Sequence, residues 1–182
     1  CAAPGGKACH LLELQPSIRE LVALDISESR LQRVIENTTR LDLRLTPLVA
    51  DASALPETLL ARPFDAILAD VPCSATGVMR RNPDIKILRE FDDIAGFANQ
   101  QLAILTGLWP ALKPGGRLLY VTCSLLAVEN DEVVSRFATR HGAHIDAVTL
   151  GTGTPRQHGW QTLPNRRGGD GLYFALLRKP AE

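Results

Sequence analysis

Two cysteines stand in segments whose residue types could support covalent chemistry. Cys73 belongs to Asp70-Val71-Pro72-Cys73-Ser74-Ala75-Thr76-Gly77, and Cys123 belongs to Val121-Thr122-Cys123-Ser124. Each segment comes at the end of a short apolar run typical of a buried strand. A lone cysteine is usually a small core residue. Two thiols that follow consecutive strands, one of them beside Asp70, instead indicate a chemical site.

The chemistry that suits a pair of thiols is addition to an electron-poor double bond. A thiolate adds readily once nearby donors or positive charge lower the pKa of the thiol. Carbon C6 of a pyrimidine is such an electrophile, and addition there makes C5 a nucleophile that can take a methyl group from a sulfonium donor. A base then removes the C5 proton and the thiol leaves. This chemistry does not by itself decide whether Cys73 or Cys123 attacks.

The elements that must position the thiols can be predicted from the apolar pattern. Strands are expected at 21–25, 46–51, 64–70 and 117–122. One helix should begin at Ser27 as its N-cap, a second should run from Leu102 to Leu112 and stop at 113–116, and a third should cover 130–140. Strands that alternate with helices predict an α/β fold with a mostly parallel, doubly wound sheet. The loops at 151–155 and 168–171, followed by a strand at 172–178, predict an antiparallel hairpin at one sheet edge.

Acidic residues also fall at predicted strand ends, where ligands bind in open α/β sheets. Asp25, Asp51 and Asp70 occupy such ends. Asp25 could accept hydrogen bonds from a ribose, or it could only cap the helix that starts nearby. Pro4-Gly5-Gly6-Lys7 forms a turn before a helix, where main-chain N–H groups favour an anionic group. This turn matches neither the P-loop nor the usual nicotinamide fingerprint, which argues against an NTPase and a nicotinamide enzyme.

Composition narrows the class of protein. The chain has 182 residues with 45% hydrophobic and 22% charged residues, as expected for one globular domain. Lysine plus arginine equals aspartate plus glutamate at 20 each, so RNA binding would need a local patch. We find no membrane segment or secretory signal, and we expect a soluble, cytoplasmic, monomeric protein whose four scattered cysteines are reduced. We expect no metal site, because Cys1, Cys9 and His10 lack paired ligand spacing.

Taken in order, the motifs of this sequence resemble those of the RNA cytosine-5 methyltransferases of the NOL1/NOP2/Sun type. The matching segments span nearly the whole chain: Cys1-Ala2-Ala3-Pro4-Gly5-Gly6-Lys7, Leu24-Asp25-Ile26-Ser27, Asp51-Ala52, Asp70 to Gly77, Thr122-Cys123-Ser124 and Gly169-Asp170-Gly171. The resemblance implies a Rossmann-like fold that binds S-adenosylmethionine. The family places a strand before Cys1, at the centre of the sheet, so we interpret the chain as a fragment that lacks this first strand.

The resemblance also implies roles for individual residues. Cys1, Ala2, Ala3, Pro4, Gly5, Gly6 and Lys7 would surround the methionine part of S-adenosylmethionine. Asp25 would hold the ribose, Asp51 the adenine edge, and Asp70 would lie between the cofactor and the target base. Cys123 would attack C6, and Cys73 would assist product release. In the DNA cytosine-5 methyltransferases the nucleophile belongs to a Pro-Cys motif, so the choice of Cys123 depends on the RNA-family pattern.

The partner predicted from this resemblance is RNA. The segment 80–90 carries a net charge of +2, and Arg80, Arg81 and Lys86 are candidate phosphate contacts, although a solvated loop with incidental charge is the alternative. The segment and the C-terminal tail are similar to bacterial enzymes that act on small-subunit ribosomal RNA, while related members modify tRNA. A non-catalytic RNA-binding or assembly module is the competing function. His141, His144 and His158 are interpreted as surface or loop residues.

Overall fold

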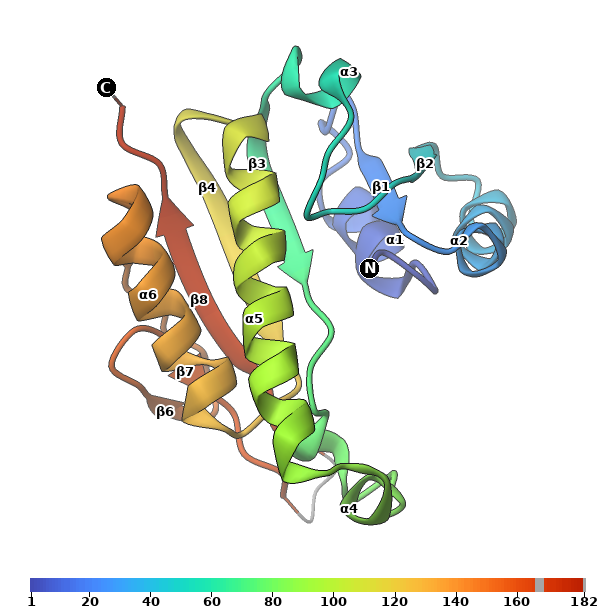
Figure 1. Ribbon diagram of the computed structural model, residues 1–182. Helices are drawn as coiled ribbons and strands as arrows, with labels where there is room; N and C mark the ends of the chain where they lie inside the picture. Colours follow the sequence, from blue (N-terminus) through green and yellow to red (C-terminus); the bar gives the residue numbers. More distant parts are fainter. Residues whose placement is uncertain (166–168, 182) are drawn as a thin grey trace. The chain divides into compact units, whose positions relative to one another are not determined.

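A computed structural model describes residues 1–165 and 169–181 of the chain (Figure 1). Gly168, part of the predicted loop 168–171, lies outside the described residues. The chain forms two compact units, Cys1–Pro56 and Glu57–Glu182. The prediction of one domain stays a prediction.

The first unit is a small α/β layer built on two parallel strands. Helix α1 (Gly6–Leu14) precedes strand β1 (Val22–Asp25), and helix α2 (Glu28–Arg40) leads to strand β2 (Thr46–Val49). β1 pairs parallel to β2, with Val22 opposite Thr46 and Asp25 opposite Val49. Ser27 caps α2, because its hydroxyl accepts the N–H of Arg30 at 3.3 Å. The apolar face of α2 then buries Leu31 and Val34 against Ala23.

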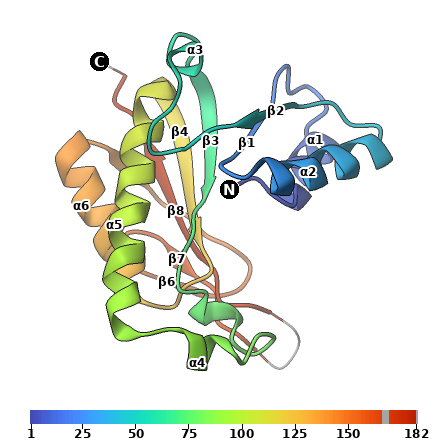
Figure 2. The same ribbon diagram turned by 45° about the vertical axis from the view of Figure 1, so that its right-hand side comes forward.

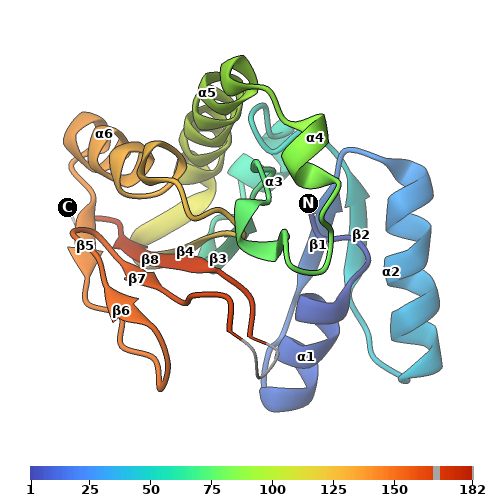
Figure 3. The ribbon, with the colours of Figure 1, turned by 90° about the horizontal axis from the view of Figure 1, so that it is seen from below.

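The second unit contains a sheet of six strands. Strands β3 (Phe64–Asp70) and β4 (Leu112–Thr122) pair in parallel, and β8 (Tyr173–Arg178) pairs antiparallel to β4. The order is β3-β4-β8-β7-β6, with β7 (Trp160–Gln161), β6 (Thr154–Pro155) and, paired to β8, β5 (His144–Asp146). β8 therefore lies inside the sheet, between β4 and the short strands (Figure 3).

Two helices of the second unit, α5 (Phe91–Leu108) and α6 (Asp131–His141), lie side by side on one face of this sheet (Figures 1 and 2). The core between them and the strands includes Leu105, Leu118, Val133 and Phe137, each with 0% exposure. The shorter helical segments are α3 (Glu57–Leu60), α4 (Ile85–Leu88) and the 3-10 turns Thr76–Val78, Trp109–Ala111 and Ala127–Glu129.

Most of the predicted helices and strands are confirmed, but some of their boundaries differ from those predicted from the local residue pattern. The strand at 64–70 and the cap at Ser27 are as predicted. The helix expected to reach Leu112 ends at Leu108, and Leu112 with 113–116 already belongs to β4. Tertiary pairing with β3 outweighs the leucine spacing there. The C-terminal strand is antiparallel as predicted, but it is interior, because β5 and β7, which were not predicted, pair with it.

The remaining expectations from the sequence concern the cysteines, His141, membrane helices and metal sites. All four cysteines are free thiols, as predicted. His141 was expected on a surface or loop but lies in the last turn of α6, half-buried and stacked on Phe137 at 4.5 Å between ring centroids. None of the described helices is both long and apolar enough to cross a membrane. Within residues 1–165 and 169–181, no group of three or more His, Cys, Asp or Glu side chains is placed to hold a metal ion.

Candidate active site

The two cysteine segments meet at one end of the second unit's sheet. β3 and β4 are parallel neighbours with Asp70 opposite Val121, so the chain leaves both strands at the same edge. The loops that follow bring the Sγ atoms of Cys73 and Cys123 to 3.3 Å from each other. The sequence predicted that these loops would lie together, and the structure confirms that the two thiols are in direct contact.

The two thiols differ in their environment. Cys73 is buried with 8% exposure, whereas Cys123 is half-buried. The contact with Cys123, followed by burial, raises the pKa of Cys73 above the usual range of a thiol. Two thiols in contact do not readily lose two protons, because the second thiolate would form beside the first. The contact and the burial therefore both disfavour the ionised form of Cys73.

Two glycines allow three loops to meet beside the thiols. The N–H of Gly77 donates to the carbonyl of Cys123 at 2.8 Å, and the N–H of Gly171 donates to the carbonyl of Gly77 at 2.9 Å. A Cβ atom on Gly77 would overlap the carbonyl oxygen of Gly171 and lie 2.9 Å from that of Cys123. Gly77 and Gly171 are thus required by the close approach of their main chains.

A buried carboxylate, which the sequence did not single out, lies behind the two loops. Glu129 has 0% exposure and ends the 3-10 turn before α6. It accepts hydrogen bonds from the N–H and hydroxyl of Ser74 and from the hydroxyl of Ser124, at 2.8, 2.5 and 2.5 Å. Ser74 and Ser124 directly follow the two cysteines, so the carboxylate joins the two loops.

Two further buried polar residues extend this network. Gln101, on α5, donates to the carbonyl of Pro72 at 2.9 Å and to Glu129 at 3.1 Å. Asn130 accepts from the hydroxyl of Thr122 at 2.6 Å and donates to the carbonyl of Ser124 at 2.9 Å. A sequence signal existed for Gln101, because it shares the apolar face of α5 with Ala98 and Leu105, both buried. A polar residue on such a face must find partners inside the protein.

The basic residues predicted to contact RNA are exposed, but not all are free. The Arg81 guanidinium forms an ion pair with Asp170, through both Nε and Nη2, and so ties its segment to the Gly-Asp-Gly motif. Arg80 and Lys86 are exposed, Lys86 on the short helix α4. Arg89 donates to the carbonyl of Ser74 at 3.3 Å and packs over the Phe97 ring. Part of this positive charge therefore supports the loop of Cys73.

In the first unit, the opening residues form a loop held mainly by main-chain hydrogen bonds. The N–H of Ala2 donates to the carbonyl of Leu24, and that of Gly5 donates to the carbonyl of Ala2, both at 2.9 Å. The Ala3–Pro4 peptide bond is cis, and Gly5 has φ +98°. A Cβ on Gly5 would come to 3.0 Å from Cγ1 of Val34. The loop thus delivers the chain to the first turn of α1, where Gly6 and Lys7 are exposed.

Asp25 lies beneath this loop at the end of β1. It is buried, and its carboxylate accepts the N–H of Ala3 at 3.2 Å and of Ser27 at 3.1 Å. Burial alone would raise the pKa of Asp25, but the hydrogen bonds from Ser27 and Ala3, together with the nearby Arg30 guanidinium, outweigh it and lower the pKa. The alternative that Asp25 caps helix α2 is wrong, because the N-cap of α2 is Ser27. The predicted contact with a ribose stays a prediction.

Asp51 follows β2 and is exposed. Its carboxylate accepts both the hydroxyl of Ser53, at 2.7 Å, and the N–H of Ser53, at 2.8 Å. These hydrogen bonds, first of all the one from the hydroxyl, lower the pKa of Asp51. Asp51 is thus an ionised acceptor at the carboxyl end of a strand, which suits the predicted contact with an adenine edge but does not test it.

The first unit offers chemistry that fits an amino-acid cofactor. The first N–H groups of a helix have no partner within the helix and favour an anion, and Gly5, the N-cap of α1, provides no side-chain cap. A carboxylate such as that of S-adenosylmethionine matches this donor set. The same unit holds acidic residues at the ends of β1 and β2, as ribose and base recognition would require.

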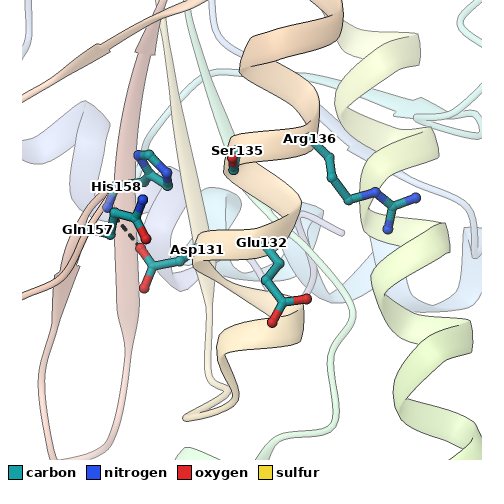
Figure 4. Close-up of a pocket in the computed structure, with 6 residues that line it drawn as sticks. All are labelled: Asp131, Glu132, Ser135, Arg136, Gln157 and His158. Carbon is teal, nitrogen blue, oxygen red and sulfur yellow. Dashed lines mark hydrogen bonds between the residues drawn. The ribbon is translucent and has the colours of Figure 1, made fainter.

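A separate hollow, of about 260 Å³, lies at the start of α6 (Figure 4). It is lined by Asp131, Glu132, Ser135, Arg136, Gln157 and His158. The carboxylate of Asp131 is already used there, since it accepts the N–H of His158 at 2.8 Å and the hydroxyl of Tyr173 at 2.9 Å. Neither cysteine lines this hollow, so we do not assign the site to it.

Comparison with known proteins identifies the family. The profile described as "16S rRNA methyltransferase RsmB/F" matches residues 1–178. The chain is 46% identical over its whole length to the ribosomal RNA small subunit methyltransferase B of Pseudomonas syringae pv. tomato. It is 48% identical over 98% of its length to the protein of the same name from Salmonella paratyphi B. The chain spans only 42% and 41% of these two relatives.

The fold is similar to that of a solved methyltransferase structure. The crystal structure of NSun6 from Pyrococcus horikoshii with SFG, an analogue of S-adenosylmethionine, has a TM-score of 0.86 and 31% identity. The alignment covers 100% of this chain and 47% of that one. The predicted Rossmann-like methyltransferase fold and the predicted cofactor class agree with this family. The chain belongs to the 16S rRNA methyltransferase RsmB/F family.

Proposed function

We propose that the protein containing this chain methylates C5 of a cytosine in RNA, with S-adenosylmethionine as methyl donor and Cys123 as the covalent nucleophile. The observation that carries the proposal is the contact of the Cys73 and Cys123 Sγ atoms, 3.3 Å apart at the ends of parallel strands. Membership of an rRNA methyltransferase family supports RNA methylation, and the thiol pair supports the covalent route.

The difference between the two thiols favours Cys123 as the attacking group. Cys123 is the more exposed of the two, and the pKa of Cys73 is raised by its contact with Cys123 and by burial. Cys123 is therefore the sulfur that an incoming nucleobase would reach more readily. This physical difference points to the same residue as the family pattern.

The reaction proceeds in balanced steps. The Cys123 thiolate forms a bond to C6, and the C5–C6 electron pair becomes available at C5. Bound S-adenosylmethionine would supply the methyl group to C5 and leave as S-adenosylhomocysteine. A base would then take the C5 proton, which restores the double bond and expels the Cys123 thiolate. Cys73, whose sulfur is in contact with that of Cys123, would assist release of the methylated product, as the family implies. Asp70, at the end of β3, would orient or protonate the ring.

The cofactor would be held by residues of the first unit. Cys1 to Lys7 would surround the methionine part, with the first turn of α1 facing its carboxylate. Asp25 would contact the ribose and Asp51 the adenine. Because Asp25 is buried and its two oxygens already accept N–H groups, its contact with a ribose would use the remaining lone pairs.

The proposed RNA substrate is the small-subunit ribosomal RNA named in the family description. Arg80 and Lys86 are exposed cations available to phosphates, while Arg81 would have to share its charge with Asp170. The target base must be unstacked before C5 and C6 become accessible. A tRNA substrate is the second candidate, and assays with both RNAs distinguish them.

The test is covalent trapping with RNA that contains 5-fluorocytosine, whose C5 fluorine blocks the proton-loss step. The intact wild-type protein should form a stable adduct in the presence of S-adenosylmethionine, and Cys73→Ala should still form it. Cys123→Ala should form none. Cys9→Ala, which removes a buried thiol of α1, is the matched control and should form the adduct. An adduct in Cys123→Ala but not in Cys73→Ala would reverse the assignment, and no wild-type adduct would favour the binding-module function.

A further inference from the structure

Glu129 connects the two cysteine loops, and we propose that it is the positioning residue that sets the spacing of the Cys73 and Cys123 thiols. This inference rests on the proposed function, since it concerns how that site is assembled. The proposal comes from the buried side chains of the second unit, not from the strand-end motifs.

The contacts of Glu129 reach the residue after each cysteine. Oε1 accepts the N–H of Ser74 at 2.8 Å and Nε2 of Gln101 at 3.1 Å. Oε2 accepts the hydroxyls of Ser74 and Ser124, each at 2.5 Å. One fully buried carboxylate therefore bonds to both loops, and their relative position depends on it.

Neighbours of Glu129 fix the other side of each cysteine. Gln101 also donates to the carbonyl of Pro72, the residue before Cys73, at 2.9 Å. Asn130 bonds to the side chain of Thr122 and to the carbonyl of Ser124, the residues on either side of Cys123. The hydroxyl of Tyr120 donates to the main-chain carbonyl of Glu129 at 2.6 Å. This hydrogen bond holds the main chain from which the Glu129 carboxylate projects.

The burial of Glu129 argues for a specific role. A carboxylate taken out of water is unfavourable unless hydrogen bonds replace its hydration. Among the described residues, no lysine or arginine is recorded in an ion pair with Glu129. Its four donors instead come from Ser74, Ser124 and Gln101. A carboxylate suits this place because each of its oxygens can accept two hydrogen bonds, so all four donors are satisfied.

The consequence for the reaction is geometric. A nucleophile displaced by about 1 Å from its attack position can lose roughly 100-fold in rate. Glu129 acts on the thiols through Ser74 and Ser124, so its removal should loosen both loops without removing a reacting group. The effect should fall on the covalent step and leave the affinity for S-adenosylmethionine unchanged.

The experiment measures the single-turnover rate of adduct formation with 5-fluorocytosine RNA in the intact protein, together with calorimetric binding of S-adenosylmethionine. Glu129→Ala should slow the adduct about 100-fold with wild-type cofactor affinity. Glu129→Gln should remain within about 10-fold of wild type. Its amide oxygen can accept the two N–H donors, and its NH₂ group can donate to the two serine hydroxyls. Glu132→Ala, an exposed glutamate three residues away, is the control and should react as wild type.

The outcomes separate the two proposals. No adduct in the wild type refutes the cytosine chemistry, whereas a wild-type adduct with an unchanged rate in Glu129→Ala refutes the positioning role alone. Equal loss in Glu129→Gln and Glu129→Ala, with a shifted pH profile, would make Glu129 an acid–base group instead. If Glu129→Ala does not fold, Ser124→Ala decides, because it removes one donor to the carboxylate. It should slow the adduct about 10-fold, and a wild-type rate there overturns the proposal.

Discussion

The opening loop of the first unit and the cysteine loops of the second unit are held by different kinds of interaction. The loop at 1–7 is fixed chiefly by main-chain hydrogen bonds to β1, by the conformation of Gly5 and by Asp25 beneath it. The cysteine loops are fixed by a close main-chain contact at Gly77 and by the side chains of Gln101, Glu129 and Asn130.

This difference determines where each site can be damaged. A loop held by its own main chain is sensitive to changes within its own few residues. A loop held by buried side chains is also sensitive to substitutions far away in the sequence, such as those in α5 or before α6. The cysteine site should therefore be the more vulnerable of the two, and glycine substitutions offer a direct comparison.

The largest effect is expected for Gly77→Ala. The new methyl group would overlap the carbonyl of Gly171 and approach that of Cys123, both of which are main-chain atoms that cannot rotate away. Inserting a methyl group into such a tight contact should cost about 3 kcal/mol of unfolding free energy, and the adduct should be lost. Urea unfolding followed by circular dichroism measures the cost.

Gly96→Ala is the matched control for that substitution. Gly96 lies in α5, and a Cβ there would meet nothing within 4 Å. Alanine in a helix is favoured over glycine by about 1 kcal/mol, so this variant should be slightly stabilised. If Gly77→Ala were as stable as Gly96→Ala, the three loops would not be in the close contact described here.

The contrast between the loops also explains what could be predicted from the sequence. Pro4, Gly5, Pro72 and Gly77 mark their turns directly, and strand ends placed both cysteines and the acidic residues. Glu129 escaped prediction because it is five positions beyond Ser124 and its partner Ser74 is 55 positions away. Its hydrogen bonds to both cysteine loops form only when the folded chain brings these distant residues together.

The fold shows the same division between local and non-local signals. The apolar run at 64–70 predicted β3 to the residue, since a buried strand has a strong local pattern. The short strands β5, β6 and β7 contain only two or three residues each, and they exist because β8 pairs with β5 and β7, and β7 in turn pairs with β6. The pattern of two or three residues is too short to show this pairing.

Gly5→Ala tests the opening loop and should have an intermediate effect. An alanine at φ +98° is strained, and its Cβ would lie 3.0 Å from Cγ1 of Val34. The expected loss is about 2 kcal/mol of unfolding free energy, with weaker binding of S-adenosylmethionine measured by calorimetry. Gly6→Ala is the neighbouring control for the unfolding free energy alone, because nothing lies within 4 Å of its Cβ and it begins α1. A loss in Gly6→Ala equal to that in Gly5→Ala would show that the conformation of Gly5 is not what holds the loop.

The smallest effect concerns the charge beneath the opening loop, and it depends on pH. The pKa of Asp25 is lowered in the folded protein from its ordinary value of 3.8, because the hydrogen bonds from Ser27 and Ala3 and the nearby Arg30 guanidinium outweigh the effect of burial. The ionised form thus stabilises the fold at any pH above the unfolded value, and this contribution is lost as the pH falls through the lowered folded pKa. Asp25→Asn, which keeps one acceptor oxygen, should cost about 1 kcal/mol at pH 7. The difference from wild type should shrink below about pH 4.

Urea unfolding of both proteins between pH 7 and pH 3 measures this difference. Asp51→Asn provides the comparison, because the pKa of Asp51 is also lowered but its carboxylate is exposed and screened by solvent. A gap between wild type and Asp25→Asn that stays constant down to pH 3 would mean that Asp25 acts through shape alone. A gap that closes would mean that the main-chain-held loop relies on one buried charge, as the cysteine loops rely on Glu129.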